Sequence, residues 1–318
     1  MEEGKKFDAV VLGELNVDII LSSIKCMPEI GKEILADEMT LTLGSSSAIF
    51  ASNLSSLGAK VAFVGKIGFD HFASVVLESL ESKKVDTSAI KRSEQSNTGA
   101  TIVLNYDQDR ANVTYPGAMS DFKLSDIDFQ FIAKARHLHF SSCFLQPGIR
   151  NDLKEIFQKA KQIGLSTSLD PQWDPDEKWD LNWADLLPFV DFFLPNAEEI
   201  KRLTGRTSIN DAVDKLKSVA RNIVIKNGDK GAYLWDGIKL IHQPVFHNGH
   251  IVDCIGAGDS FNAGFIYRYL QKFPLRECLE FGALTGAINT TRAGGTGAFS
   301  TIEEIRKIAK QQFGFLTF

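Results

Sequence analysis

Residues 253–259 read Asp-Cys-Ile-Gly-Ala-Gly-Asp, and the chain continues as Ser260-Phe261-Asn262-Ala263-Gly264-Phe265-Ile266-Tyr267. Phe261 and Phe265 are four residues apart, with further apolar residues beside them, which predicts a helix. The preceding stretch is a loop with few large side chains that leads into the start of that helix. The first N–H groups of a helix have no partners within it and carry the positive end of its dipole, so we expect the loop to bind an anion.

Four residues of this loop carry the expected chemistry. Gly256, Ala257 and Gly258 let a phosphate approach the backbone, because no side chain there is larger than a methyl group. Asp259 would repel that anion unless it had a task, and accepting a proton from an attacking hydroxyl is such a task. The alternative is structural: Asp259 caps the helix and the glycines turn the chain.

Two common nucleotide-binding motifs do not fit. A dinucleotide-binding fingerprint needs a glycine where Phe261 stands. A Walker A loop needs Gly-Lys followed by Ser or Thr, and neither Gly31-Lys32-Glu33 nor Gly65-Lys66-Ile67 supplies it. The sequence therefore points to a phosphate-binding loop with its own base.

Composition excludes several classes of protein. The chain has 318 residues, of which 44% are hydrophobic and 24% charged, as in a globular protein with a large core. A net charge of −5 argues against nucleic acid as a partner. The four cysteines form no Cys-x-x-Cys pair, and no apolar run is long enough for a signal peptide or a membrane span. We expect a reduced, cytoplasmic protein.

The order of apolar segments predicts an α/β fold. Buried strands are expected at 7–13, 60–65, 137–141, 165–170, 191–194 and 222–226, and helices at 48–57, 70–80, 149–163, 197–204, 208–220, 275–290 and 301–312. Strands that alternate with helices form a parallel sheet covered on both faces. Two further stretches, 19–43 and 98–115 with a turn at 107–110, look like small antiparallel flaps. A hairpin is also expected through 233–235.

Polar residues near strand ends are candidate ligand contacts. Asn16 and Asp18 follow the first strand, and ligands of open α/β sheets bind beyond the carboxyl ends of the strands. Gly44 and Ser45 open a second small-residue loop before a helix, which could also bind a polar ligand, although such loops are usually caps. The turn formers in Asp170-Pro171-Gln172 have a plain structural explanation as well.

Three further segments could bind nucleotide and cations. Asn196 and Glu199 could hold a hydrated Mg²⁺, or form a capping box at a helix start. The turn Lys226-Asn227-Gly228-Asp229-Lys230-Gly231 could lie against a flat nucleotide, or be an ordinary hairpin turn. Asp253 and the small-residue loop 290–297 could hold a monovalent cation, or the loop could simply be flexible. The histidines 242, 247 and 250 have no metal-site spacing and are expected in a surface loop.

Together these motifs resemble the PfkB, or ribokinase-like, family of sugar kinases. Residues 251–264 are similar to its carboxyl-terminal signature, and residues 196–199 to its Asn-x-x-Glu motif. Gly13 with Asn16 and Asp18 looks like its first strand and sugar contact, 44–58 like its Gly-Gly loop and helix, 65–70 like its next segment, and 226–231 like its adenine-side loop. The resemblance covers nearly the whole chain.

The resemblance implies one Rossmann-like kinase domain over residues 1–318, with a small β lid from about 16–43 and 98–117. It implies ATP and Mg²⁺ as cofactors, K⁺ as a further candidate, and transfer of the γ-phosphoryl group to a sugar hydroxyl. Asp259 would be the base and the amides of 256–258 the anion hole. The helix N-terminus is expected to keep Asp259 ionised. Because lid strands with open edges often pair, a homodimer through the lid is expected.

Departures from the family pattern bear on the substrate. Ser45 replaces the second glycine of the Gly-Gly pair, and Ile49 stands where the family has a sugar-binding asparagine. The stretch 170–174 lacks the Asn and Arg of fructokinases and ketodeoxygluconate kinases, which favours a neutral sugar. Ketodeoxygluconate and nucleoside kinases remain alternatives, as does a catalytically silent sugar- or nucleotide-binding regulator.

Overall fold

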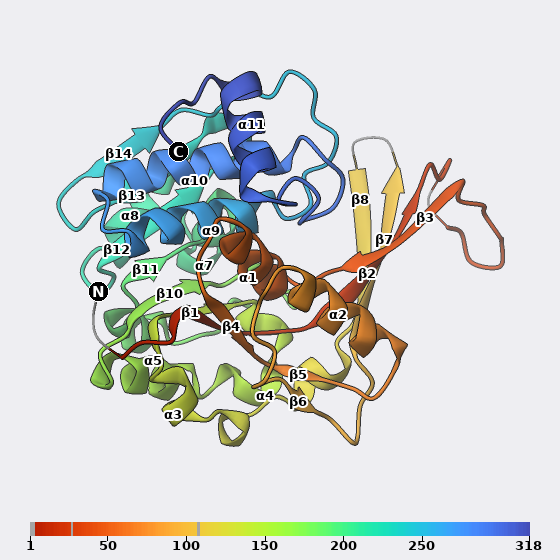
Figure 1. Ribbon diagram of the computed structural model, residues 1–318, viewed down its shortest axis with the longest axis horizontal. Helices are drawn as coiled ribbons and strands as arrows, with labels where there is room; N and C mark the ends of the chain where they lie inside the picture. The colour runs from red at the N-terminus through yellow and green to blue at the C-terminus, as the bar shows by residue number, and fades with distance from the viewer. Residues whose placement is uncertain (1–3, 27, 107–108) are drawn as a thin grey trace.

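The computed structural model describes residues 4–26, 28–106 and 109–318, and a large β-sheet forms its centre (Figure 1). The strands lie in the order β14-β13-β12-β11-β10-β9-β1-β4. Neighbours from β12 to β4 are parallel, and β13 and β14 join antiparallel at one edge. The bounds are β1 Phe7–Leu12, β4 Val61–Val64, β9 Ala135–Ser141, β10 Ser166–Asp170, β11 Phe192–Phe193, β12 Asn222–Lys226, β13 Ala232–Trp235 and β14 Leu240–Gln243. The expected mostly parallel sheet is confirmed.

Helices cover both faces of the large sheet. One face packs against α1 Ser46–Ser56, α2 His71–Ser82, α9 Ala257–Leu270 and α10 Leu275–Asn289. The other packs against α3 Phe129–Ile132, α5 Leu153–Gln162, α6 Trp183–Leu186, α7 Ala197–Thr204 and α8 Ile209–Leu216. The last helix, α11 Ile302–Phe313, lies against α10.

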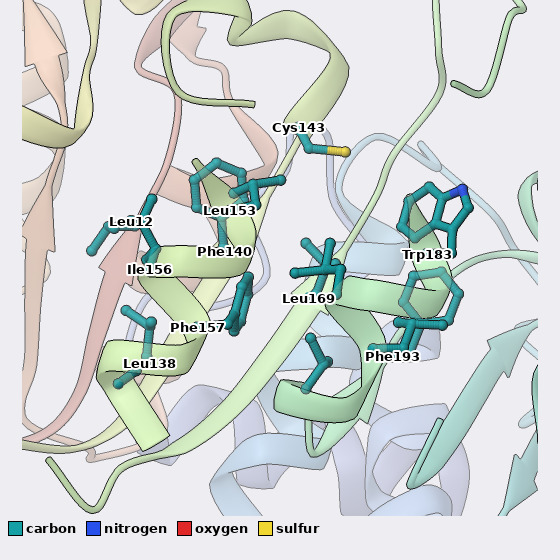
Figure 2. Packing of buried hydrophobic residues seen from close by; sticks show 14 of the residues in the cluster. Leu12, Leu138, Phe140, Cys143, Leu153, Ile156, Phe157, Leu169, Trp183 and Phe193 are labelled. Atoms are coloured by element: carbon teal, nitrogen blue, oxygen red, sulfur yellow. The ribbon is translucent and has the colours of Figure 1, made fainter. Parts of the chain in front are cut away.

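Strand β1 shows how the sequence builds two cores from one sheet. Val10 and Leu12 point into the core on one face, and Ala9 and Val11 into the core on the other. Because successive side chains of a strand point to opposite faces, a strand buried on both faces is apolar throughout. Figure 2 shows part of the first core, where Phe157 of α5 lies beside the strands.

A second, smaller sheet stands apart from the large one in Figure 1, in the order β3-β2-β7-β8. Its strands are β2 Asn16–Ser22, β3 Glu38–Leu43, β7 Gly99–Tyr106 and β8 Asp109–Tyr115. The two expected flaps are therefore one sheet, because β2 and β7 pair in parallel between two antiparallel partners. Asn16 and Asp18 lie within β2 and not in a loop after β1. The turn expected at 107–110 includes residues 107 and 108, which lie outside the described residues.

Several expected elements differ in extent. The helix expected at 149–163 is two helices, α4 Pro147–Arg150 and α5, separated by a tight turn in which the Asp152 amide donates to the Ile149 carbonyl. The strand expected at 191–194 has two residues, and the helix expected at 208–220 ends at Leu216. His242 lies on β14 and not in a loop.

All four cysteines are free thiols, of which Cys143 and Cys278 are buried. In the part of the chain that the structure describes, no helix combines the length and apolar character needed to cross a membrane.

Candidate active site

A cavity of about 1170 Å³ lies where the carboxyl ends of the large sheet face the small sheet. Thirteen of the residues expected in the site line it: Asn16, Asp18, Ser45, Asn196, Glu199, Lys226, Asn227, Gly228, Gly231, Gly256, Ala257, Gly258 and Asp259. Gly44 and Asp253 lie just outside this lining. The fold thus brings together residues that are up to about 240 positions apart in the chain.

The loop before α9 has the conformation that an anion site needs. Gly256 is the N-cap residue with φ +73°, and no side chain among the described residues caps the helix. A Cβ atom at Gly256 would lie 2.6 Å from the Cα atom of Gly295, so the loop also packs too closely for a larger residue. The Ala257 amide donates to the Cys254 carbonyl at 3.2 Å, whereas the amides of Gly256 and Gly258 have no hydrogen-bond acceptor among the described residues.

Asp259, in the first turn of α9, points into polar surroundings at the cavity. Its residue is 7% exposed, and its Oδ1 atom accepts a hydrogen bond from Gln172 Nε2 at 3.1 Å. Burial, followed by the negative charge of Asp170, raises the pKa of Asp259 well above its usual value. The expectation that the helix N-terminus keeps this carboxyl ionised considered the dipole alone; burial shifts the pKa in the opposite direction, and its effect is the larger one.

Behind Asp259 lies a buried ion pair between β10 and β12. Lys226 Nζ donates to Asp170 Oδ2 at 2.5 Å, and the Asp170 side chain is fully buried. The same oxygen accepts from Asn262 Nδ2 at 2.6 Å and Gln172 Nε2 at 3.1 Å. Gln172 therefore bridges the carboxylates of Asp170 and Asp259, which ties the candidate base to the ion pair.

A second buried carboxylate, Glu14, follows β1. Its Oε1 atom accepts from the Ser47 amide at 3.2 Å and from Ser142 Oγ at 2.9 Å, and its Oε2 atom accepts from Ser47 Oγ at 2.5 Å. Burial raises the pKa of Glu14, while these hydrogen bonds lower it. Glu14 thereby holds the start of α1 against the ends of β1 and β9.

The small sheet contributes the polar wall opposite Asp259. Asn16 Nδ2 donates to Asp18 Oδ1 at 3.1 Å and to Thr101 Oγ1 at 3.0 Å, and Thr101 Oγ1 lies 3.0 Å from Thr114 Oγ1. Gly44 lies directly behind this group, where a Cβ atom would collide with Asn16 and Asp18. The side chains that the sequence proposed as sugar contacts therefore form one hydrogen-bonded group.

Ser45 and Ile49 flank this wall. Ser45 Oγ accepts from the Ala48 amide at 2.9 Å and donates to the Glu14 carbonyl at 2.7 Å, so its hydroxyl serves as a helix cap. Ile49 lines the cavity and contacts Gly295 of the 290–297 loop. The position where the family has a polar sugar contact is therefore apolar here.

Asn196 and Glu199 form the capping box of α7. Asn196 Oδ1 accepts from the Glu199 amide at 2.9 Å, and Glu199 Oε2 accepts from the Asn196 amide at 2.7 Å. Burial, followed by the charge of Asp170, raises the pKa of Glu199 to about 7. Among the described residues no three acidic, histidine or cysteine side chains gather into a metal cluster. This donor set fits a cation that keeps most of its own waters, as Mg²⁺ does.

The remaining expected residues lie in the turn after β12, in the loop before α9 and in the loop after α10. The 227–231 turn connects β12 to β13, with the Asn227 amide donating to the Gly231 carbonyl at 2.8 Å. Asp253 accepts from the amides of Ile255 at 2.9 Å and Gly294 at 2.8 Å. Its carboxylate thus joins the loop before α9 to the 290–297 loop.

Sequence reasoning missed Glu14, Asn262 and the bridging role of Gln172. Glu14 follows the first strand directly, and Asn262 lies one turn after Asp259 on the same helix, so their positions pointed to this edge. Asp170 was noted only as a turn residue. The sequence does not show the order of the strands in the sheet. Only that order reveals that the ends of β10 and β12, on either side of β11, lie close enough for Asp170 and Lys226 to pair.

Comparisons with known proteins identify the class. The sequence profile of the pfkB family carbohydrate kinases matches residues 6–302, and the chain therefore belongs to that family. It is an enzyme of the phosphotransferase class that acts on a sugar hydroxyl.

The individual relatives do not define the substrate more narrowly than the family does. A sugar kinase of Archaeoglobus fulgidus without an assigned substrate is 29% identical over 74% of this chain and 92% of its own. The 2-dehydro-3-deoxygluconokinase of Bacillus subtilis is 25% identical over 96% of this chain and 97% of its own. The structure of Arabidopsis thaliana ribokinase complexed with ribose and ATP superposes with a TM-score of 0.84 at 25% identity, covering 96% of this chain and 99% of that one.

Proposed function

We propose that this protein transfers the γ-phosphoryl group of ATP to a hydroxyl of a small neutral sugar. Asp259 accepts the hydroxyl proton, and the backbone amides around Gly256, Ala257 and Gly258 stabilise the negative charge on the phosphates. The observation that carries the proposal is the position of Asp259. It is a carboxylate in the first turn of a helix without a side-chain cap, in the wall of a cavity between two sheets.

The raised pKa of Asp259 suits a base. A general base is most effective when its pKa lies near the working pH, because it is then ionised often enough and still holds a proton well. An Asp at its ordinary value would accept a proton only weakly. Burial in the cavity wall moves the pKa of Asp259 in the required direction.

The charge of the lining supports a neutral substrate. The described residues that line the cavity include no Arg, and their single Lys, Lys226, is paired with Asp170. The aromatic side chains of Phe144 and Trp173 in the same lining would suit a nucleoside base, which makes a nucleoside the second candidate.

Cofactor binding is assigned from the remaining lining residues. Mg²⁺ would be held through water by Glu199 and Asn196, and it would neutralise phosphate charge during transfer. The 226–231 turn would lie along the nucleotide. Asp253 with the carbonyl groups of the 290–297 loop would hold a monovalent cation. This cation would lie beside residues 254–258, which we call the anion loop.

The small sheet would act as a lid and as a dimer interface. Its inner face lines the cavity, so closure would exclude water that otherwise competes as acceptor. Its outer face exposes five large apolar side chains, Met39, Leu41, Ile102, Val113 and Tyr115. Such a patch favours pairing of two copies. Light scattering should show a dimer for the natural protein and a monomer for Ile102→Lys; a natural protein that is monomeric at micromolar concentration would contradict the pairing.

An acceptor screen tests the function. ATP consumption is measured by a coupled assay with fructose, ribose, 2-keto-3-deoxygluconate, fructose phosphates and nucleosides. We expect turnover with a neutral sugar, and mass spectrometry should find one added phosphate on it. ATP binding without turnover on any acceptor would favour a regulator, and preference for an acid would contradict the argument from charge.

A further inference from the structure

The side chain of Lys226 lies between a buried carboxylate and the anion loop. Its Nζ atom donates to Asp170 Oδ2 at 2.5 Å, and the side chain is 13% exposed. On the other side, a Cβ atom built on Gly258 would be 3.6 Å from Lys226 Cδ and 3.8 Å from Nζ. The ammonium group therefore stands where the first turn of α9 would present a phosphate.

Acidic groups already outnumber cations around Lys226. The carboxyls of Asp170, Asp259 and Glu199 all lie within electrostatic range, and Lys226 is the cation that lowers the pKa of both Asp259 and Glu199. A nucleotide that enters the cavity brings several more negative charges. A cation stabilises a nearby negative charge most strongly where water is excluded. Lys226 is therefore well placed to stabilise the charge of the phosphates.

Hydrogen-bond capacity allows Lys226 to serve a ligand and Asp170 together. An ammonium has three donors, and the bond to Asp170 uses one of them. Asp170 also accepts from Asn262 and Gln172, so it stays hydrogen-bonded if the ammonium tilts toward a phosphate. A small rotation of the lysine chain would be enough, because Gly258 leaves that side open.

We propose that Lys226 is a catalytic residue that contacts the phosphoryl group during transfer, and that Asp170 is the positioning residue that aims it. The inference rests on the proposed function and deepens it. As the bond between the sugar oxygen and phosphorus forms, the bond from phosphorus to the bridging oxygen breaks and ADP keeps the electron pair. The sugar proton goes to Asp259, and Lys226 keeps all its protons.

The competing explanation is that the ion pair only fastens β10 to β12. A second partly buried pair offers a matched control, since Lys161 Nζ lies 2.6 Å from Asp191 Oδ2. Lys161 is in α5 on the other face of the sheet, and neither residue lines the cavity. Lys161→Met therefore tests the loss of a partly buried lysine pair away from the cavity, although Asp191 keeps its second partner Arg221 at 3.2 Å.

The experiment compares Lys226→Met, Lys226→Arg, Asp170→Asn and Lys161→Met in three measurements: kcat with the accepted sugar, calorimetric Kd for ADP and for a non-hydrolysable ATP analogue, and Tm. We expect Lys226→Met to lower kcat by about 10²-fold or more. It should raise the Kd for the ATP analogue about tenfold more than the Kd for ADP, because only the γ-phosphate loses its cation. Lys226→Arg should have a higher kcat than Lys226→Met, because it keeps a positive charge. Lys161→Met should lower Tm without changing kcat or either Kd.

Each outcome has a separate meaning. Lys226→Met with kcat within threefold of the natural protein would overturn the inference and leave the kinase function intact. Equal weakening of ADP and the ATP analogue would also overturn it, because the lysine would then not contact the γ-phosphate. If the natural protein phosphorylates no acceptor but Lys226→Met still loses the preference for the ATP analogue, the kinase function fails and the phosphate contact stands. If Lys226→Met is unfolded, the double variant Lys226→Met with Asp170→Asn removes both charges. Loss of its preference for the ATP analogue over ADP would support the inference, and an unchanged preference would overturn it.

Discussion

Two helices in this protein begin after loops of small residues, and the protein treats the two beginnings differently. Helix α1 follows Gly44-Ser45, and α9 follows the 254–256 loop; both abut the cavity. On sequence grounds the start of α9 was a candidate anion site, and the start of α1 was a candidate site for a polar ligand or an ordinary cap. The comparison shows what separates a helix start that supports structure from one that is available to a ligand.

The start of α1 is satisfied by the protein itself. Ser45 Oγ accepts from the Ala48 amide, and Glu14 Oε1 accepts from the Ser47 amide. A carboxylate already occupies the place where an anion would bind. The start of α9 has no such partner: its N-cap is a glycine without a side-chain cap among the described residues. The difference is that side chains accept hydrogen bonds from the first amides of α1, whereas no side chain among the described residues caps α9.

The largest effect should come from removing the acid at the open helix start. Asp259→Asn keeps the shape of the side chain and its contact with Gln172 but cannot accept the sugar proton. We expect kcat to fall by about 10²–10⁴-fold while ATP still binds. Steady-state kinetics and calorimetric titration with the ATP analogue measure the two parts. If the variant kept more than a tenth of kcat, Asp259 would not be the base.

The next effect should come from filling the open cradle. Gly258→Ala places a methyl group 3.6 Å from Lys226 Cδ, an ordinary contact, so the fold should be unaffected. The same methyl group occupies space where a phosphate approaches the amides, and the KM for ATP should rise by about 10–100-fold. Gly249→Ala, with no atom within 4 Å of the added Cβ, is the matched control. An unchanged KM would place the phosphates elsewhere.

Much of this arrangement could be predicted from the sequence. The apolar runs gave the central strands, and the order of motifs indicated the family and thirteen of the residues that line the cavity. These signals are local: a glycine beside an aspartate, or an apolar segment of the length of a strand. The joining of the two flaps into one sheet was not local, because the β2–β7 pair connects residues more than eighty positions apart.

The raised pKa of Asp259 could not be predicted for a related reason. The helix start was visible in the sequence, and it favours the ionised form. Burial and the neighbouring charge of Asp170 oppose it, and both depend on which strand ends meet in three dimensions. A pKa is set by distances and solvent exposure, which the order of residues does not contain.

A smaller effect should appear at the closed helix start when pH is varied. Burial raises the pKa of Glu14 above its ordinary value of 4.5. Just above pH 4.5 the folded protein therefore holds a proton that the unfolded chain has lost, so this group makes stability fall as pH rises toward the folded pKa. Glu14→Gln removes that contribution, and the decline should flatten by at most about 1.4 kcal/mol per pH unit.

Urea unfolding at pH 5, 6, 7 and 8 measures this slope. Glu29→Gln serves as the control, because Glu29 is exposed and its ion pair with Lys32 lies at the surface. A Glu14→Gln slope identical to that of the natural protein would mean that Glu14 is not the group responsible.

The smallest effect concerns Ser45 and separates the contribution of its hydroxyl from the strain of its backbone. Its hydroxyl caps α1, and its backbone has φ +69°, a conformation that favours glycine. Ser45→Ala loses the cap and keeps the strain, so the free energy of unfolding should fall by about 1 kcal/mol. Ser45→Gly loses the cap and relieves the strain, so the loss should be only a few tenths of a kcal/mol. Urea titrations of the two variants provide the test: equal losses would show that backbone strain at position 45 is negligible, and that the serine is there for its hydroxyl alone.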